Sequence, residues 1–451
     1  MLRFSAILIF LLCPFTLLAY HMPVSVEAAR KASTFTRVQV SFEIVMEEAT
    51  VSTITATGVE KIATVVRDPF EEKMGMSATE VIQGIWKNLK EMKPDYVKIS
   101  SVTSFLSDHR FRISIRTSET WVIGEVLYTG PATPFTSTTG VSWRKFYGTR
   151  GRRHFYQSVA GMILERVAID RLVKRNFKGL LRLTFLPFLD EYPSFSNGGD
   201  YIAFISDRIG GNRNVHVISL KEGRIMNFPV YGSSEYFPHF SPDDSKILFQ
   251  GTMYGEWDVF VMPFSREYAS SIRLITSKLP NAYTPSWYDN KRILVAVDEG
   301  KGSDVYIVDT LTRVSTNLTN TPDIYEMYPY RIPNTPSIIY VRLKTDGTYG
   351  IFKHTLEGSS TVFQDEVYNE FDPMISHDGH YLVFSSNDDT MYRIWVKDLL
   401  TGEATCVSAA LPYDCYYPSI SPDGALIIFA AYYPDGEPDL WVAKNPFIEE
   451  W

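Results

Sequence analysis

A short apolar strand recurs six times in the C-terminal 270 residues of the chain. Each copy begins eight or nine residues after a proline, and most copies have a turn rich in Ser, Asp and Gly between the proline and the strand. Further along every copy, an apolar residue followed by a ring-bearing residue predicts another strand. The apolar strands begin at Ile202, Ile247, Ile293, Ile338, Leu382 and Ile427.

The prolines define the length of the repeat. They stand 44 to 47 residues apart, and an aromatic residue precedes each of them within two positions. The fullest form of the turn that follows is Ser421-Pro422-Asp423-Gly424. It is typical of a tight hairpin, because Pro fixes one backbone angle and Gly accepts a positive φ. The six prolines are Pro193, Pro238, Pro285, Pro329, Pro373 and Pro418.

Four short antiparallel strands in about 45 residues are typical of one blade of a β-propeller. Six such copies predict a mainly β fold, a closed six-bladed β-propeller of four-stranded blades over residues 180–451. The last copy has the pattern for only three strands. Thr184 lies nine residues before the first proline, at the offset of a fourth strand, so we predict that residues 181–184 complete the sixth blade.

The hydrophobic pattern changes in residues 30–178 and predicts a small α+β domain in front of the propeller. Ser77 and Glu80 form a capping box before a helix with one apolar face, which ends before Pro94. A second helix is expected over residues 155–174. Alternating apolar residues predict strands over residues 62–66, 96–102, 109–116 and 121–128.

An apolar segment near the N-terminus, residues 4–19, follows a positive charge and is short for a bilayer span. It predicts a secretory signal peptide over residues 1–19, with cleavage after Ala19 or as late as Ala28; an uncleaved anchor is the alternative. An exported protein meets an oxidising compartment. Cys406 and Cys415 would there either form a disulfide or stay buried thiols.

Composition and charge narrow the classes of partner. The chain is 45% hydrophobic and 21% charged, which excludes intrinsic disorder. Its net charge of −8 disfavours a general binder of nucleic acid or anionic membrane. Residues 144–182 are the exception, with 11 Lys and Arg against Glu165 and Asp170. The alternatives for this segment are a solvated helix face, binding to anionic lipid or surface polysaccharide, and docking against the acidic propeller.

The sequence offers few groups for catalysis. It has neither a Gly-x-Ser-x-Gly elbow nor a glycine-rich nucleotide loop, so a non-enzymatic role is expected. The histidines fall at different positions of the repeat and are not expected to meet at one metal. No cofactor is expected, although a cation at the mouth of the propeller channel is compatible with the acidic residues of the repeat.

These acidic residues stand three positions before the proline in most repeats, and four in the last. Equivalent positions of a cyclic array lie at equal radius, so we predict a ring of carboxylates, flanked by aromatic residues, at one mouth of the channel. Either these acidic side chains only cap loops and keep them hydrated, or this rim binds a cation or a basic partner. The acids are Asp190, Glu235, Glu326, Glu370 and Asp414, and the aromatic residues are Tyr192, Tyr236, Tyr283, Tyr328, Phe371 and Tyr417.

An exported chain with a small α+β domain and six repeats with Ser-Pro-Asp-Gly turns over residues 190–443 resembles the TolB family. The resemblance implies a monomeric periplasmic adaptor, peripheral to a Gram-negative envelope, which serves envelope integrity and cell division in the Tol–Pal system. It also implies two partners, the peptidoglycan-associated lipoprotein at the propeller mouth and a TolA-like protein at the segment after the signal peptide. An exported propeller enzyme and a carbohydrate-binding module, both acting on polysaccharide, are the other hypotheses.

Overall fold

The structure is a computed structural model. It describes residues 24–448 except for 28–37, 45–46, 56–57, 68, 96, 101–108, 119, 129–133, 231, 266, 322, 356–357, 359, 365–367, 388–389 and 435. The predicted signal peptide and both of its cleavage sites lie outside the described residues. Within the described part, no helix combines the length and the apolar character that a membrane crossing requires.

Two compact units make up the chain. One comprises residues 1–167 with 185–187, and the other comprises residues 168–184 with 188–451. The boundary expected from the sequence, near residue 179, differs from this division, which falls inside a long helix. Each unit has its own sheets and its own core.

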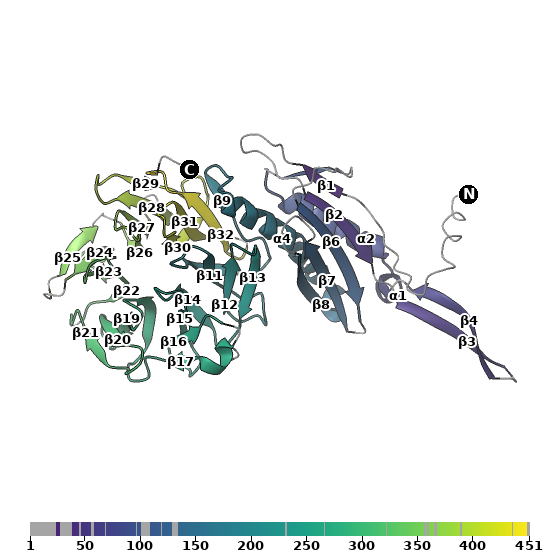
Figure 1. Ribbon diagram of the computed structural model, residues 1–451, viewed down its shortest axis with the longest axis horizontal. Helices are drawn as coiled ribbons and strands as arrows, with labels where there is room; N and C mark the ends of the chain where they lie inside the picture. Colours follow the sequence, from purple (N-terminus) through teal and green to yellow (C-terminus); the bar gives the residue numbers. More distant parts are fainter. Residues whose placement is uncertain are drawn as a thin grey trace. The chain divides into compact units, whose positions relative to one another are not determined.

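The C-terminal unit is a six-bladed β-propeller, as the sequence predicts. Six four-stranded sheets are arranged in a ring, and the strands of the first five blades are adjacent in chain order (Figure 1). All strand pairs within the blades are antiparallel. The first strand of each blade contains the repeated proline and lies next to the central channel, and the fourth strand lies at the outside.

The bounds of the strands follow the repeat closely. Blades one to three are β10 (Asp190–Phe195), β11 (Tyr201–Ser206), β12 (Asn214–Ser219) and β13 (Arg224–Phe228); β14 (Glu235–Phe240), β15 (Lys246–Gly251), β16 (Asp258–Pro263) and β17 (Arg273–Leu274), with a 3-10 helix over Tyr268–Ser271; and β18 (Ala282–Trp287), β19 (Arg292–Asp298), β20 (Ser303–Asp309) and β21 (Ser315–Asn317). Blades four to six are β22 (Glu326–Arg331), β23 (Ile338–Leu343), β24 (Tyr349–His354) and β25 (Ser360–Gln364); β26 (Glu370–Ile375), β27 (Tyr381–Ser386), β28 (Arg393–Asp398) and β29 (Ala404–Cys406); and β30 (Asp414–Ile420), β31 (Leu426–Tyr432) and β32 (Asp439–Lys444), completed by β9 (Leu180–Arg182).

The sixth blade is closed by a strand from the N-terminal side of the propeller, which confirms the prediction for residues 181–184. Strand β9 pairs with β32, so that Leu181 lies opposite Val442. The Leu183 N–H donates to the carbonyl of Leu440 (2.8 Å), and Arg182 forms an ion pair with Asp439 (2.6 Å). The first and last segments of the propeller are thereby joined in one sheet.

The predicted hairpin turns join the first and second strands of the blades. In the sixth blade, the Ser421 hydroxyl donates to Asp423 (2.6 Å), and the Gly424 N–H donates to the Ser421 carbonyl (2.8 Å). Gly424 has a φ of 71°, a conformation that costs other residues energy. The sequence of this turn therefore fixes the reversal of the chain between the two strands.

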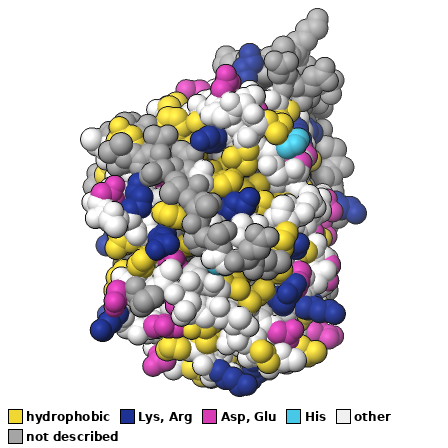
Figure 2. Space-filling model, turned by 90° about the vertical axis from the view of Figure 1, so that its left-hand side faces the viewer, with side chains coloured by type: hydrophobic (Ala, Val, Ile, Leu, Met, Phe, Trp, Pro, Cys, Tyr) yellow, Lys and Arg dark blue, Asp and Glu magenta, His cyan; other side chains and the backbone are white. Residues whose placement is uncertain are grey.

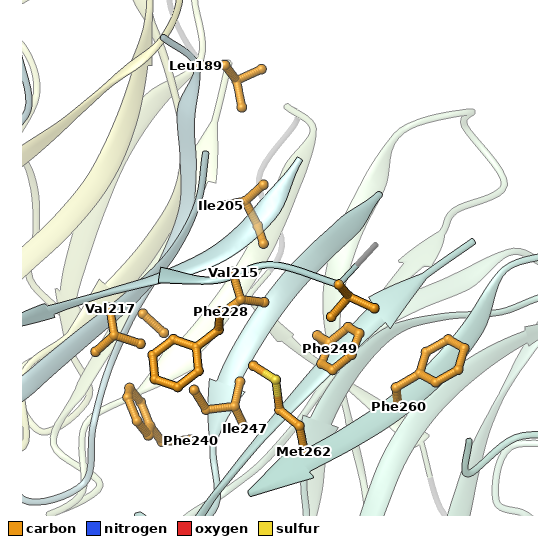
Figure 3. Close-up of a cluster of buried hydrophobic side chains, with 12 residues drawn as sticks. Leu189, Ile205, Val215, Val217, Phe228, Phe240, Ile247, Phe249, Phe260 and Met262 are labelled. Atoms are coloured by element: carbon orange, nitrogen blue, oxygen red, sulfur yellow. The ribbon is translucent and has the colours of Figure 1, made fainter. Parts of the chain in front are cut away.

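The core of the propeller lies between neighbouring blades. Figure 3 shows one such cluster, in which Val215 and Phe228 of the first blade lie beside Ile247 and Met262 of the second. These side chains are almost completely buried. Because each sheet has both faces covered by neighbouring blades, its second strand contains a continuous apolar run, such as residues 202–205 and 293–297, rather than an alternation with polar residues.

The N-terminal unit is an α+β arrangement. Its main sheet has the order β5-β1-β2-β6-β7-β8, and β3 and β4 form a separate hairpin. A Cβ atom placed on Gly124 of β7 would lie 2.7 Å from the side chain of Val159, so helix α4 crosses this strand closely. The strands are β1 (Val24–Glu27), β2 (Val38–Ile44), β3 (Glu47–Thr55), β4 (Gly58–Arg67), β5 (Lys98–Ser100), β6 (His109–Thr117), β7 (Trp121–Tyr128) and β8 (Phe135–Ser142), and the helices are α1 (Pro69–Met74), α2 (Ala78–Met92), α3 (Trp143–Phe146) and α4 (Thr149–Val173).

The capping box of α2 is present as predicted. The Glu80 N–H donates to the Ser77 hydroxyl (3.3 Å), and the Glu80 carboxylate accepts from the Ser77 N–H (2.6 Å). The predicted strand over residues 121–128 coincides with β7, and the one over residues 62–66 lies inside β4. Strands β1, β2, β3 and β8 were not predicted, although apolar and polar residues alternate strictly in β2 from Val38 to Ile44.

Candidate functional site

The residue before each of the six prolines has a left-handed backbone, and none of the six is glycine. In the first blade this residue is Tyr192, and the pairing register of β10 shifts between Glu191 and Ser194, which marks a β-bulge. Such a conformation is costly for residues other than Gly and is therefore often found at functional sites. The six residues and their φ angles are Tyr192 (52°), Phe237 (49°), Thr284 (45°), Tyr328 (51°), Asp372 (55°) and Tyr417 (58°).

These six residues line the narrow part of the central channel, a cavity of about 60 Å³. Aromatic rings fill much of it: the ring of Tyr192 lies 4.3 Å from that of Phe237 and 4.1 Å from that of Tyr417. Asp372 is the acidic residue among the six, and its carboxylate accepts from the Tyr417 N–H (3.2 Å) and the Ser385 hydroxyl (3.1 Å). Burial raises the pKa of Asp372 to about 7 in spite of these hydrogen bonds.

Aromatic side chains continue from this constriction around the end of the channel at which the first strands begin. Consecutive ring centroids along the series are 4.1 to 6.0 Å apart. Every member is half-buried. We call this series the aromatic arc; in spatial order it consists of Trp257, Tyr236, Tyr192, Tyr417, Tyr416, Tyr392, Phe371 and Tyr349.

The predicted aromatic residues are thus largely brought together. Tyr192, Tyr236, Phe371 and Tyr417 belong to the arc, and Tyr328 lies in the constriction next to Phe371 (6.2 Å between ring centroids). The sixth, Tyr283, is half-buried in the third blade, and burial raises its pKa to about 12. Sequence reasoning missed Trp257, Tyr349 and Tyr392. The signal was present, because each stands two residues before the apolar residue of the predicted third strand.

The predicted acidic rim is not found as an exposed ring. Asp190, Glu235, Glu326 and Glu370 are completely buried in the wall of the propeller, and only Asp414 is half-buried. These four are the first residues of their strands. Two of them face cations: Asp190 accepts two bonds from Arg208 (2.8 and 2.9 Å), and Glu326 lies 3.8 Å from Arg342.

The other end of the channel is wider, with a cavity of about 390 Å³ at the hairpin turns. His239 and His377 both line it, although the sequence placed them at different positions of the repeat. Burial lowers the pKa of His239 to about 4, and its ring lies 3.2 Å from the Ser194 hydroxyl. Across the described ranges of the chain, no three His, Cys, Asp or Glu side chains lie close enough together to hold a metal ion.

Comparison with known proteins adds a similarity of fold. No family model and no curated protein matches the chain. Among solved structures, TolB from Agrobacterium tumefaciens is 20% identical (TM-score 0.46; 58% of this chain and 91% of that one). TolB from Acinetobacter baumannii is 15% identical, with a TM-score of 0.45 over 75% of this chain and 80% of that one. The oligogalacturonate lyase from Vibrio parahaemolyticus is 12% identical, with a TM-score of 0.43 over 59% of this chain and 94% of that one. Propellers of peptidases match as well. At these identities the likeness is one of fold alone.

Cys406 and Cys415 are free thiols in the structure, not a disulfide. Cys406 lies on β29, the outer strand of the fifth blade, whereas Cys415 lies on β30, the inner strand of the sixth. Cys415 is completely buried and packs in the core of the sixth blade. Of the two alternatives that the sequence left open, the structure therefore corresponds to thiols.

The buried Glu235 makes the stability of the propeller depend on pH. Burial raises the pKa of this carboxyl to about 8, and its two buried oxygens have no hydrogen-bond partner among the described residues. Between pH 4.5 and 8 the folded protein keeps a proton that the unfolded chain releases, so stability falls as pH rises through this window. For Glu235→Gln we expect a shallower fall, with stability equal to the wild type near pH 5 and higher at pH 8, measured by urea denaturation across this range.

The matched control is Glu256→Gln, a substitution at an exposed carboxylate of the same blade. This variant should reproduce the pH profile of the wild type. Identical profiles for Glu235→Gln and the wild type would contradict the burial of an ionisable group at this position.

Proposed function

We propose that the protein is a non-enzymatic adaptor that recognises another protein through the aromatic arc of its propeller. The single observation that carries the proposal is the arc itself, eight half-buried rings in consecutive contact at one end of a closed channel. Tyr and Trp dominate the binding energy of protein interfaces, because they combine a large apolar area with a polar group. Rings that already pack against one another also lose little side-chain freedom on binding.

The polar groups at this end of the channel are already engaged within the propeller. Arg213 donates to Glu191 (2.7 Å) and lies 5.2 Å from the ring of Tyr236, and the Tyr392 N–H donates to Asp414 (2.8 Å). Four of the five predicted carboxylates are buried. We therefore assign recognition to the rings rather than to an acidic rim, and expect binding to depend only weakly on salt.

The place of this adaptor in the cell follows from the resemblance to the TolB family and from the predicted signal peptide. Under this proposal, the protein is exported to the periplasm, associates peripherally with the envelope and acts in the Tol–Pal system, where it contributes to envelope integrity and division. The partner at the arc is then the peptidoglycan-associated lipoprotein, and a TolA-like protein binds the segment that follows the signal peptide.

The test is direct binding of the full chain to the peptidoglycan-associated lipoprotein of the same cell, measured by calorimetry. Two substitutions in the arc, Tyr236→Ala and Tyr392→Ala, should each raise Kd by about 30-fold or more, as expected for central aromatic residues of an interface. Raising the salt concentration from 0.1 to 0.5 M should change Kd by less than about threefold, because no charge pair carries the contact.

The control is Leu400→Ala, a substitution at an exposed residue of the turn between β28 and β29. In an antiparallel meander this turn lies at the edge of the blade away from the arc, so binding should stay unchanged.

A different result would establish a carbohydrate-binding module instead. In that case the protein would not bind the lipoprotein, but it would bind neutral or acidic oligosaccharides, and Tyr236→Ala would abolish that binding. Unaltered lipoprotein binding by both arc variants would contradict the assignment of the arc.

A further inference from the structure

The positive charges of residues 144–182 fall into two groups. Towards the C-terminal end, most cations are neutralised or buried: Lys174 pairs with Asp170 (2.8 Å), and Arg182 pairs with Asp439. Arg166 is buried with its guanidinium over the ring of Tyr128 (4.7 Å). Towards the N-terminal end, the cations remain at the surface. We call this second group, together with the tyrosine among them, the basic patch: Arg144, Lys145, Tyr147, Arg150 and Arg153.

Helix α3 and the first turns of α4 hold the basic patch in a defined shape. A Cβ atom on Gly151 would lie 2.1 Å from the Lys145 carbonyl oxygen, so the two helices meet without room for a larger residue. Arg152 secures this junction by donating to the Tyr147 carbonyl (2.9 Å). Arg150 and Arg153 are three residues apart in α4 and therefore lie on the same side of the helix.

The charges of the basic patch have no stabilising role that the fold explains. Among the residues that the structure describes, no Asp or Glu forms an ion pair with Arg144, Lys145, Arg150 or Arg153. The first turn of α4 contains no acidic residue. Cations at the start of a helix are unfavourable, because the helix dipole places partial positive charge there. On the face shown in Figure 2, by contrast, positive and negative side chains are interspersed.

We propose that the basic patch binds the headgroups of a bilayer that contains anionic phospholipid. Clustered cations gain free energy near such a surface without needing a defined pocket. Tyr147 has half of its surface exposed (50%) and stands between the charged residues. An amphipathic ring of this kind is typical of the interface between water and lipid, where its hydroxyl stays hydrated and its ring enters the headgroup layer. The N-terminal unit would thus attach the protein to a membrane surface independently of the aromatic arc.

The test is co-sedimentation of the full chain with vesicles of phosphatidylcholine containing 30% phosphatidylglycerol, compared with vesicles of phosphatidylcholine alone. The wild type should bind the anionic vesicles at least tenfold better at 0.1 M salt, and 0.5 M salt should abolish the difference. Replacing Arg144, Lys145, Arg150 and Arg153 together by Gln should lower the partition coefficient about 600-fold, because each removed charge costs about fivefold. The single variant Tyr147→Ser should also lower the partition coefficient relative to the wild type, although its net charge is unchanged.

A matched control removes the same charge elsewhere. Four exposed lysines of the propeller, Lys221, Lys278, Lys291 and Lys301, are replaced together by Gln, and binding should change by less than threefold. Unchanged circular dichroism and an unchanged midpoint of thermal unfolding show that both fourfold variants are folded. Equal binding of the wild type to the two kinds of vesicle, or equal losses in the two fourfold variants, would overturn the proposal. Binding to heparin without binding to anionic vesicles would overturn it in favour of an acidic polysaccharide.

Discussion

Replacing Leu183 by alanine is expected to lower the free energy of unfolding of the propeller by about 2–5 kcal/mol. Leu183 is completely buried just after β9, and its N–H donates to the Leu440 carbonyl across the closure of the ring. The substitution removes apolar contacts at the place where the two ends of the propeller meet, and it leaves a cavity there. Urea denaturation of the full chain, followed by tryptophan fluorescence, measures the loss.

The same substitution at an exposed leucine gives the comparison. Leu400 is 75% exposed, and Leu400→Ala should change the free energy of unfolding by less than about 0.5 kcal/mol. If Leu183→Ala were no more costly than Leu400→Ala, the segment that closes the sixth blade would contribute nothing to stability, which would contradict closure of the ring by this segment.

A second large effect is expected at the buried ion pair of the first blade. In Arg208→Met, the Asp190 carboxylate loses its partner in the wall of the propeller, which should cost about 3–5 kcal/mol near pH 7. Burial already raises the pKa of Asp190, and loss of the guanidinium raises it further. The folded variant then keeps a proton that its unfolded chain releases, so its stability should fall as pH rises, and the defect should be smaller at pH 5 than at pH 8.

Two further variants separate this cost from a general effect of losing arginine. The double variant Asp190→Asn with Arg208→Met removes both charges and should recover most of the stability, with little dependence on pH. Arg224→Met breaks an exposed pair with Glu222 and should cost less than about 1 kcal/mol. A loss in Arg208→Met that is small and independent of pH would show that the pair is not buried as described.

The sequence was sufficient for the architecture because its signals are repeated. Six prolines at nearly constant intervals, most of them followed by turn residues such as Ser421 and Gly424, predicted six blades. The offset of Thr184 predicted the closure of the ring. These features depend on backbone conformation and on the count of residues, and both can be read from a single chain.

The position of the candidate site could be predicted only in part, because it depends on β-bulges. A bulge adds one residue to a strand and reverses the face on which the following side chains lie. The residue before the proline, Tyr192 in the first blade, therefore faces the channel, whereas Asp190 is enclosed between blades. Nothing in residue type alone distinguishes these positions. Trp257, Tyr349 and Tyr392 were missed for another reason, since they lie at or directly before the start of the third strands rather than on the strands that carry the prolines.

The closure of the ring also constrains the order of events during biosynthesis. The Leu440 N–H donates to the Thr184 hydroxyl, a residue 256 positions earlier in the chain. The segment that completes the last blade is thus made before any other part of the propeller, and its partner strand is made last. Five blades can assemble as they emerge from the ribosome or the translocon, but the edge of the first segment stays unpaired until synthesis is complete. Contacts of such long sequence separation form slowly, so final ring closure should be the slow step of folding.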